Sequence, residues 1–332
     1  MSLNVLRFFG YNKIPAALSS FRVEEVPSSF LYPDNRELAE TLKGWGFTET
    51  LTSSLVSESA CASFGVEADQ LVKLSNPLSQ DETVLRPLLI PNLLKAIQTN
   101  VNHQRESVFL FEEGARHLMN RAIDKPVEER ALAFVGYGEL SSKTWNAESR
   151  EIDFFYLKSY FEGINQKLGG EYTLKLEQAR PFLHPHQSFS VHQNGNQMGW
   201  GGVLHPEMAG RFDLNRSCIV FEIQLDSRRK AVLQFKEFSK FPFVERDIAV
   251  LIDKTVPWSR IAEIVHEMGG PLLQEVKPFD LFSGGSMDAS KKSVAFRCRL
   301  QHDQKTLSET DITQTIDRIK SALTERCGAQ LR

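Results

Sequence analysis

The clearest alternation of hydrophobic and polar positions lies in residues 240–332. Residues 246–253 bring every second apolar side chain to one face, which is the pattern of a half-buried strand. A helical spacing of apolar residues follows Pro257 and ends at Gly269, a residue type common at helix C-termini. A second strand is predicted over residues 273–282. The first half of this region therefore predicts a strand, a helix and a strand.

The second half of the region completes the pattern. Residues 293–300 alternate strictly with the apolar side chains inward, so Arg297 and Arg299 share the opposite face. Ser308 is placed to cap a last helix, and residues 329–332 can add a short strand. The order strand, helix, strand, strand, helix, strand is that of a ferredoxin-like βαββαβ sandwich, although a fold alone does not give a function.

The preceding residues predict a second, larger domain over 33–226. Strands are predicted over 48–56, 108–112, 131–138 and 218–225, a hairpin over 188–204, and helices after Asp34, after Pro87 and over 153–168. These elements show no repeated βαβ pattern, so the predicted class is α+β, an antiparallel sheet flanked by helices.

The domain boundary is expected in a charged stretch without strong periodicity, residues 227–239, which we interpret as a linker. Residues 1–32 contain apolar residues and prolines but no complete element. We expect them to be the remnant of a preceding module and linker, and the chain to come from a longer protein.

Composition narrows the class of protein. The formal net charge of −3 argues against binding of nucleic acid through overall charge, although a local basic face stays possible. The 4 cysteines lie far apart without a CxxC pair, and no apolar run approaches the length of a membrane span. These features predict a cytoplasmic protein with no membrane contact.

Three histidines are the first candidates for chemistry. His184 and His186 lie one residue apart, and a hairpin can bring His205 near them, which would suit a metal-dependent hydrolase. However, His184 and His205 each precede a proline, and no carboxylate or cysteine stands at a ligand-like spacing. A structural role is therefore favoured, and no metal ligand is predicted.

The glycines around Trp200 are a second candidate, because glycine-rich turns can bind phosphate. These glycines lie inside a predicted strand, and no Lys-Ser/Thr pair follows them: Gly199, Gly201 and Gly202. We interpret them as sites of close packing against a neighbouring backbone.

The outward face of residues 293–301 is the third candidate. Arg297 and Arg299, approached by Lys292, form a strand face that can bind phosphates, and arginine planes also stack on unpaired RNA bases. The alternative is a solvated sheet face, which spacing alone favours because surface charges are common.

Ordered motifs along the chain resemble the phenylalanyl-tRNA synthetase β-subunit family. In the first domain they are Asn76-Pro77-Leu78-Ser79, Leu85-Arg86-Pro87-Leu88-Leu89, Phe111-Glu112-Glu113-Gly114, Trp145, Asp153-Phe154-Phe155-Tyr156-Leu157-Lys158, Leu183-His184-Pro185 and Gly202-Val203-Leu204-His205-Pro206-Glu207. In the second they are Phe241-Pro242, Arg246-Asp247-Ile248-Ala249, Phe279-Asp280, Lys292-Ser293-Val294-Ala295-Phe296, Thr306-Leu307-Ser308 and Ala329-Gln330-Leu331-Arg332. The match spans nearly the whole chain.

The resemblance implies that the first domain is like a class II synthetase catalytic domain that has lost its chemistry. Leu110 stands where a catalytic domain of that class carries an arginine for the ATP phosphate, so no catalytic residue is expected. The helix after Asp34 and the strand after it correspond to the class II dimerisation motif, which implies packing on the catalytic α subunit in an (αβ)₂ heterotetramer. ATP and magnesium are implied for the complete α–β enzyme, and neither is expected to bind to this chain.

For the second domain the resemblance implies contact with the anticodon stem and loop of tRNA(Phe). The residues expected to take part are Arg297, Arg299, Lys292, Lys240, Arg246 and Phe279, with Phe282 as a further stacking candidate. The expected function is thus a non-catalytic β-subunit part of an ATP-dependent phenylalanine–tRNA ligase. The alternative is a free-standing RNA- or ligand-binding module in which the ferredoxin-like domain acts as a sensor.

Overall fold

The computed structural model describes residues 36–225, 237–284, 288 and 290–331, together with residues 7, 8, 10 and 13. The chain divides into two compact units, Met1–Val232 and Leu233–Arg332, which are described separately below. The division falls in the predicted linker, most of which lies outside the described residues, so the bounds of the linker stay a prediction. Of the predicted remnant over 1–32 only these four residues are described, and the predicted capping residue Asp34 lies outside the described residues.

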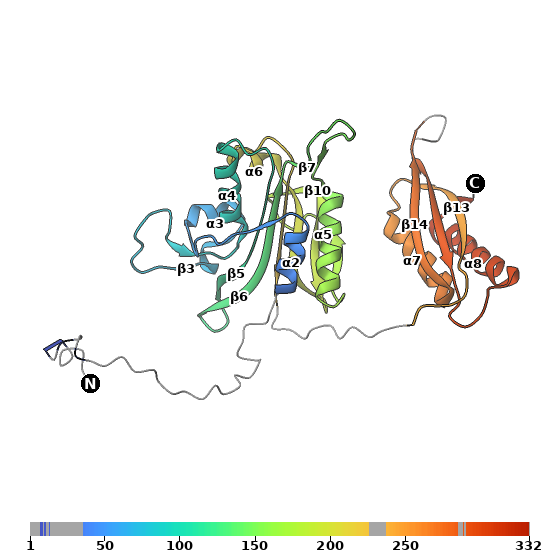
Figure 1. The fold of residues 1–332 in the computed structure, drawn as a ribbon, viewed down its shortest axis with the longest axis horizontal. Helices are drawn as coiled ribbons and strands as arrows, with labels where there is room; N and C mark the ends of the chain where they lie inside the picture. Colours follow the sequence, from blue (N-terminus) through green and yellow to red (C-terminus); the bar gives the residue numbers. More distant parts are fainter. Residues whose placement is uncertain are drawn as a thin grey trace. The chain divides into compact units, whose positions relative to one another are not determined.

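A seven-stranded sheet forms the centre of the large unit (Figure 1). In sheet order its strands are β1 (Thr48–Glu49), β5 (Val108–Asn120), β6 (Lys125–Tyr137), β12 (Cys218–Gln224), β11 (Asn196–Leu204), β10 (Leu183–Gln193) and β9 (Thr173–Leu176). Only β1 pairs in parallel, so the predicted antiparallel α+β sheet is confirmed. Asn194 and Gly195 both have positive φ, as the predicted two-residue turn between β10 and β11 requires.

Helices cover both faces of this sheet, because its central strands carry apolar side chains on both sides. Figure 1 shows α2 (Arg36–Gly44) and α5 (Phe154–Lys167) on one face and α4 (Ile90–Asn102) and α6 (Pro206–Arg211) on the other. Along β12, Phe221 contributes to the core under α2 and α5, while its neighbour Val220 contributes to the core under α4. Asp153 caps α5 by accepting the backbone N–H groups of Phe155 and Tyr156.

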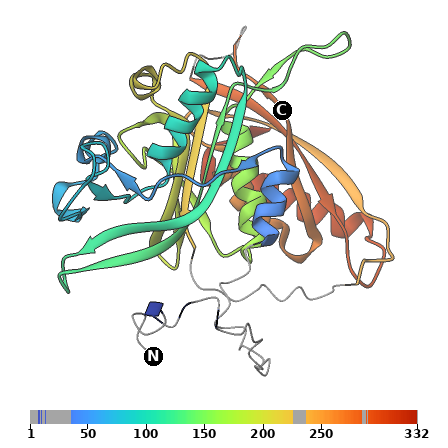
Figure 2. The ribbon, with the colours of Figure 1, turned by 60° about the vertical axis from the view of Figure 1, so that its left-hand side comes forward.

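The hairpin of β5 and β6 is longer than the sequence predicts, with 13 residues in each strand. Figure 2 shows it extending past the rest of the sheet. Cross-strand ion pairs join its outer half, Arg116 to Glu129 at 2.8 Å and Arg130 to Glu113. Charged residues are uncommon in strands, so the sequence shows no sign of a strand in this outer half. In the hairpin, however, opposite charges on facing strands stabilise the pairing.

The predicted strand over 48–56 is wrong. The structure has two short strands there, β1 and β2 (Leu55–Val56), in different sheets. Between them, Thr52 donates its backbone N–H and its hydroxyl to the carboxylate of Glu112, at 3.2 and 2.7 Å. These two hydrogen bonds to a side chain take the place of the backbone hydrogen bonds that a continuous strand would make. The strand β2 joins β4 (Val84–Leu85) and β3 (Val72–Lys73) in a small sheet beside α3 (Glu58–Ser63) and the 3₁₀ helix η2 (Ala68–Gln70).

The small unit has the predicted order of elements. They are β13 (Val244–Asp253), α7 (Trp258–Gly269), the 3₁₀ helix η3 (Gly270–Leu272), β14 (Leu273–Phe282), β15 (Lys291–Leu300), α8 (Glu309–Cys327) and β16 (Gln330–Leu331). The sheet order is β14-β15-β13-β16, with antiparallel pairing throughout. Ser308 caps α8 as predicted, and Asp311 completes a capping box with it. Between β14 and β15, residues 285–287 and 289 lie outside the described residues.

No helix in the described part of either unit is long and apolar enough to cross a membrane.

Candidate nucleic-acid interface

Within the described residues of the small unit, helices cover one face of the four-stranded sheet. The helices α7 and α8 pack on the side of Ile248, Val250, Phe296 and Cys298, which are buried. Arg297 occupies the opposite parity of β15 and is exposed, as the alternation predicts. This open face is where the sequence places the candidate binding residues.

Arg297 makes a two-pronged ion pair on this face. Its Nε and Nη2 donate to the two carboxylate oxygens of Asp247 at 2.7 and 2.9 Å. The hydrogen bond from Arg297 lowers the pKa of the Asp247 carboxyl. The guanidinium carbon also lies 5.6 Å from the centre of the Phe279 ring, which is a cation–π distance.

Arg299 repeats this arrangement two residues along β15. Its Nε and Nη2 donate to the Oε1 atom of Glu245 at 3.1 and 2.8 Å, and its Nη1 lies 3.3 Å from Glu275. Its guanidinium carbon lies 4.6 Å from the centre of the Phe243 ring. Each arginine on the open face is therefore held between a carboxylate and an aromatic ring.

The two arginines are compensated by the three carboxylates that contact them, so this part of the face is not a patch of free positive charge. The sequence reasoning missed these partners. Antiparallel pairing sets Asp247 opposite Arg297 and Glu245 opposite Arg299. The sequence shows that Glu245 and Asp247 are two residues apart and so point to the same face of β13. It does not show the pairing register that aligns them with the arginines.

Aromatic side chains accompany the arginines. Phe279, Phe282 and Phe243 are each about half exposed, at 55%, 50% and 52%. The first two were predicted as stacking candidates, and Phe243 was not identified. An exposed aromatic ring beside a guanidinium plane offers two surfaces on which an unpaired base can stack.

Three other predicted residues do not join this cluster. The Nζ of Lys292 donates to the backbone carbonyls of Lys254 and Val256, at 3.1 and 2.5 Å. Arg246 lies opposite Cys298 on the neighbouring strand and therefore on the face of the sheet that the helices cover. It pairs with Glu309, at the start of α8, at 3.1 Å. Lys240 is exposed and lies 3.6 Å from Glu237. These three cations therefore lie outside the arginine cluster, and their expected contacts with tRNA stay a prediction.

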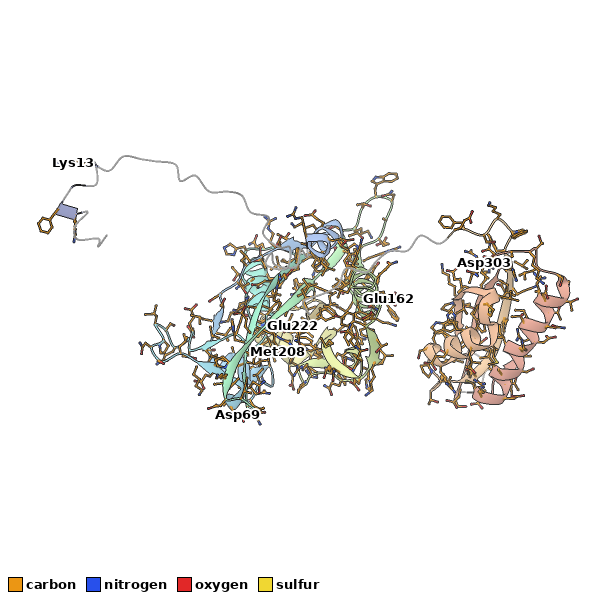
Figure 3. All side chains as sticks on the ribbon, turned by 90° about the horizontal axis from the view of Figure 1, so that it is seen from below. Lys13, Asp69, Glu162, Met208, Glu222 and Asp303 are labelled. Carbon is orange, nitrogen blue, oxygen red and sulfur yellow. The ribbon has the colours of Figure 1, made fainter. Side chains whose placement is uncertain are left out.

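The large unit also contains buried charged side chains. Glu222 of β12 is fully buried and accepts the backbone N–H groups of Leu89 and Ile90 at 2.9 and 3.3 Å, at the start of α4. Its other oxygen lies 3.2 Å from Nη1 of Arg116. Figure 3 places Glu222 within the sheet of this unit. Burial raises the pKa of the Glu222 carboxyl.

A second buried ion pair lies on the same face, between Arg86 and Glu112 at 2.7 Å. Arg86 also donates to the carbonyl of Ala115 and to the hydroxyl of Thr52, both at 2.9 Å. Leu110, two residues before Glu112 on β5, is buried in the core under α4. The members of these two ion pairs therefore bond to each other, to backbone groups and to the hydroxyl of Thr52.

The rings of two of the three candidate histidines accept hydrogen bonds from nearby backbone. The Nδ1 of His184 accepts the backbone N–H of His186 at 3.2 Å, and the Nδ1 of His205 accepts that of Glu207 at 3.3 Å, which caps α6. Within the described ranges no group of three or more His, Cys, Asp or Glu side chains is arranged to hold a metal ion. The geometry favours the structural interpretation of these residues.

Comparison with known families agrees with this architecture. Residues 239–332 match the family model for the ferredoxin-fold anticodon binding domain, so the small unit is a domain of that class. Residues 14–225 match the model for the phenylalanyl tRNA synthetase beta chain CLM domain. The chain belongs to the phenylalanyl-tRNA synthetase beta chain family.

Curated relatives match along almost the whole chain. The phenylalanine–tRNA ligase beta subunits of Bacillus subtilis and Pseudomonas savastanoi are each 32% identical, over 330 and 329 residues, and that of Staphylococcus haemolyticus is 33% identical over 334. These matches cover 98–99% of this chain and 41% of each relative. The chain thus spans about two fifths of the length of the relatives it matches. A solved pyrrolysyl-tRNA synthetase from Desulfitobacterium hafniense is 16% identical with a TM-score of 0.43, covering 58% of this chain and 67% of that one, which is too slight a likeness to assign a fold.

Proposed function

We propose that this chain is the part of a phenylalanine–tRNA ligase β subunit that supports the catalytic α subunit and contacts the anticodon region of tRNA(Phe). Family membership supports the assembly, and one observation carries the RNA contact. That observation is the open sheet face on which Arg297 and Arg299 lie against exposed phenylalanine rings.

The chemistry of this face favours unpaired bases over backbone phosphates. The carboxylates that contact the arginines offset their charge, so a phosphate would have to compete with Asp247 and Glu245. A base can instead stack on an exposed ring or on the face of a guanidinium without breaking either ion pair. An anticodon loop presents such unpaired bases, whereas a regular RNA helix does not.

For the large unit we propose a class II synthetase-like scaffold without catalysis of its own. The side chains do not suit ATP: Leu110 supplies no charge, and α4 covers the face on which it lies. The start of α4, which would attract a phosphate, is bonded to the carboxylate of Glu222. ATP and magnesium would then be bound by the α subunit of an (αβ)₂ enzyme. In this scheme α2 contacts that subunit, although the strand after α2 is shorter than the dimerisation motif implies.

The test is binding of an RNA stem-loop that carries the phenylalanine anticodon. Changing both Arg297→Ala and Arg299→Ala should weaken binding on the order of 10-fold, because stacking contributes roughly 1–3 kcal/mol per base. Lysine at both positions should restore little, since an ammonium group keeps the charge and loses the planar surface. Filter binding or fluorescence anisotropy at several salt concentrations measures both the affinity and its salt dependence.

A matched control uses the arginines on the helix side of the same unit. Arg260 and Arg326 each pair with one glutamate and are partly exposed, so their double alanine variant makes the same change in charge. We expect its affinity for the stem-loop to stay within about two-fold of the parent, since about 0.4 kcal/mol separates such values. Equal losses in the two double variants would mean that only overall charge matters, and the proposal for the open face would be wrong.

A further inference from the structure

The segment between β6 and α5 forms a hairpin that contributes only Leu140, at its base, to the core. Its strands are β7 (Glu139–Ser141) and β8 (Arg150–Glu151), paired at only two positions, and every residue from 141 to 151 is exposed. A two-stranded hairpin is marginally stable without a packed face. In Figures 1 and 2 it projects from the body of the large unit.

The base and the tip of the hairpin are nevertheless well fixed. At the base, Arg216 pairs with Glu139 at 3.1 Å, and the N–H of Ile152 donates to the carbonyl of Gly138. At the tip, the N–H of Thr144 donates to the carbonyl of Ala147 at 2.9 Å and closes a tight turn. The turn leaves its central residues exposed to solvent.

One of those central residues is Trp145, which is 96% exposed. Phe155, in the first turn of α5, is 75% exposed. Among residues 36–225 these are the two exposed side chains of Phe, Trp or Tyr, and they bracket the returning strand of the hairpin. Exposing an indole to water forgoes about 2 kcal/mol or more of burial, so a tryptophan exposed at the tip of a projecting hairpin is a candidate for an external contact.

We propose that this hairpin is a docking element for a protein partner, with Trp145 as its anchor and Phe155 as a second contact. Tryptophan is well suited to this role, because its large side chain has few rotatable bonds and loses little freedom on binding. The charges of the hairpin, two cations against three carboxylates, do not favour a nucleic-acid phosphate. The partner must therefore offer an apolar pocket of indole size.

Resting on the proposed function, we assign that partner as the catalytic α subunit. The hairpin leads directly into α5, which packs beside α2, the helix proposed above to contact the α subunit. Trp145 and Phe155, before and at the start of α5, would extend that contact beyond the two helices. A second copy of this chain and an RNA are the alternatives that the experiment below distinguishes.

The experiment uses this chain labelled with 5-fluorotryptophan and an unlabelled α subunit. The chain has 4 tryptophans, of which Trp200 is buried and Trp45 and Trp258 are half-buried. The fluorine resonance of Trp145, assigned by its loss in Trp145→Phe, should shift and lose its solvent isotope effect when the α subunit is added. Trp145→Ala should weaken that binding on the order of 30-fold, as expected for an anchor residue, and Phe155→Ala less.

Leu78→Ala is the control, since Leu78 is as exposed as Trp145 and lies in a different loop. It should bind the α subunit like the parent, and the thermal unfolding of all variants should be unchanged. If the α subunit binds but the Trp145 resonance and the Trp145→Ala affinity do not change, the docking role is overturned and the proposed function stands. If the α subunit does not bind at all, the proposed function fails and the partner assignment with it. A shift that follows the concentration of the chain alone, or the addition of RNA, would overturn the assignment in favour of that partner.

Discussion

The sheet of the large unit and the sheet of the small unit place the same kind of side-chain pair in opposite settings. In the large unit helices cover both faces, and the Arg86–Glu112 pair is buried among backbone and hydroxyl partners. In the small unit one face is open, and the Arg297–Asp247 pair is about half exposed on both sides.

The comparison shows how burial decides what an ion pair does. A buried charge cannot find water if its partner is removed, so removing one member alone is strongly destabilising. An exposed pair is screened by solvent and contributes little to stability, and its members can exchange one partner for another. The first kind of pair suits a scaffold, and the second suits a binding surface.

Removing one member of the buried pair should have the largest effect. Glu112→Ala leaves the Arg86 guanidinium in the interior without a carboxylate and removes the acceptor of two Thr52 donors. We expect a loss of about 3–5 kcal/mol in the free energy of unfolding of the large unit. Urea unfolding of the full chain, followed by circular dichroism, measures it.

The double variant Arg86→Met with Glu112→Leu tests the cause of that loss. Because it removes both charges, it should be more stable than Glu112→Ala alone. If Glu112→Ala itself cost less than about 1 kcal/mol, the pair would behave like an exposed one and the contrast between the two sheets would not hold.

A smaller effect is expected where two strands of the large sheet approach closely. A Cβ atom on Gly199 would lie 2.6 Å from the carbonyl oxygen of Glu222 and 2.9 Å from Cα of Ile223. Both obstacles are backbone atoms, so β11 and β12 would have to separate. Gly199→Ala should therefore cost about 1–3 kcal/mol, measured by the same urea unfolding.

Gly210→Ala is the matched control in the same unit. Gly210 lies in α6, and a Cβ atom there would meet nothing within 4 Å. This change should be neutral or slightly stabilising, because alanine has less freedom to lose than glycine. A loss for Gly199→Ala no larger than that for Gly210→Ala would contradict close packing of the strands.

The sequence predicts the small unit almost completely, and the reason is its one-sided sheet. Strands with one solvated face alternate clearly, so the alternation predicts both β15 and the outward direction of Arg297. The large unit is predicted less well. Strand β6 is buried on both faces in its inner half and charged in its outer half, so neither part alternates.

The partners of the site residues were harder to predict than the residues themselves. Parity along one strand shows which way a side chain points, but the pairing register decides which side chains face each other. In the sequence Asp247 stands out only as a member of the motif Arg246-Asp247-Ile248-Ala249, although it contacts Arg297 directly. Lys292 lies next to the arginine face in sequence, yet its parity turns it toward the carbonyls after β13.

The smallest effect on stability is expected on the open face itself. Asp247→Asn removes the charge that holds Arg297 while keeping a side chain of the same shape. Because the pair is exposed, the free energy of unfolding at neutral pH should change by less than about 1 kcal/mol. The affinity for the anticodon stem-loop should rise instead, with a salt dependence steeper by about one phosphate contact, because the freed guanidinium can bind RNA.

The pH dependence of RNA binding is a second test of whether loss of the Asp247 charge raises the affinity. The pKa of Asp247 is lowered in the folded chain, so its stabilising contribution is present above the pKa of the unfolded chain and disappears as the pH falls through the folded value. The parent should therefore approach the RNA affinity of Asp247→Asn in that acid range, while the variant lacks this step. An Asp247→Asn variant that binds the stem-loop no better than the parent at neutral pH would mean that the carboxylate does not compete with RNA for Arg297. The exposed pair would then be as structural as the buried one, and the distinction between scaffold and binding surface would have to rest on the aromatic rings alone.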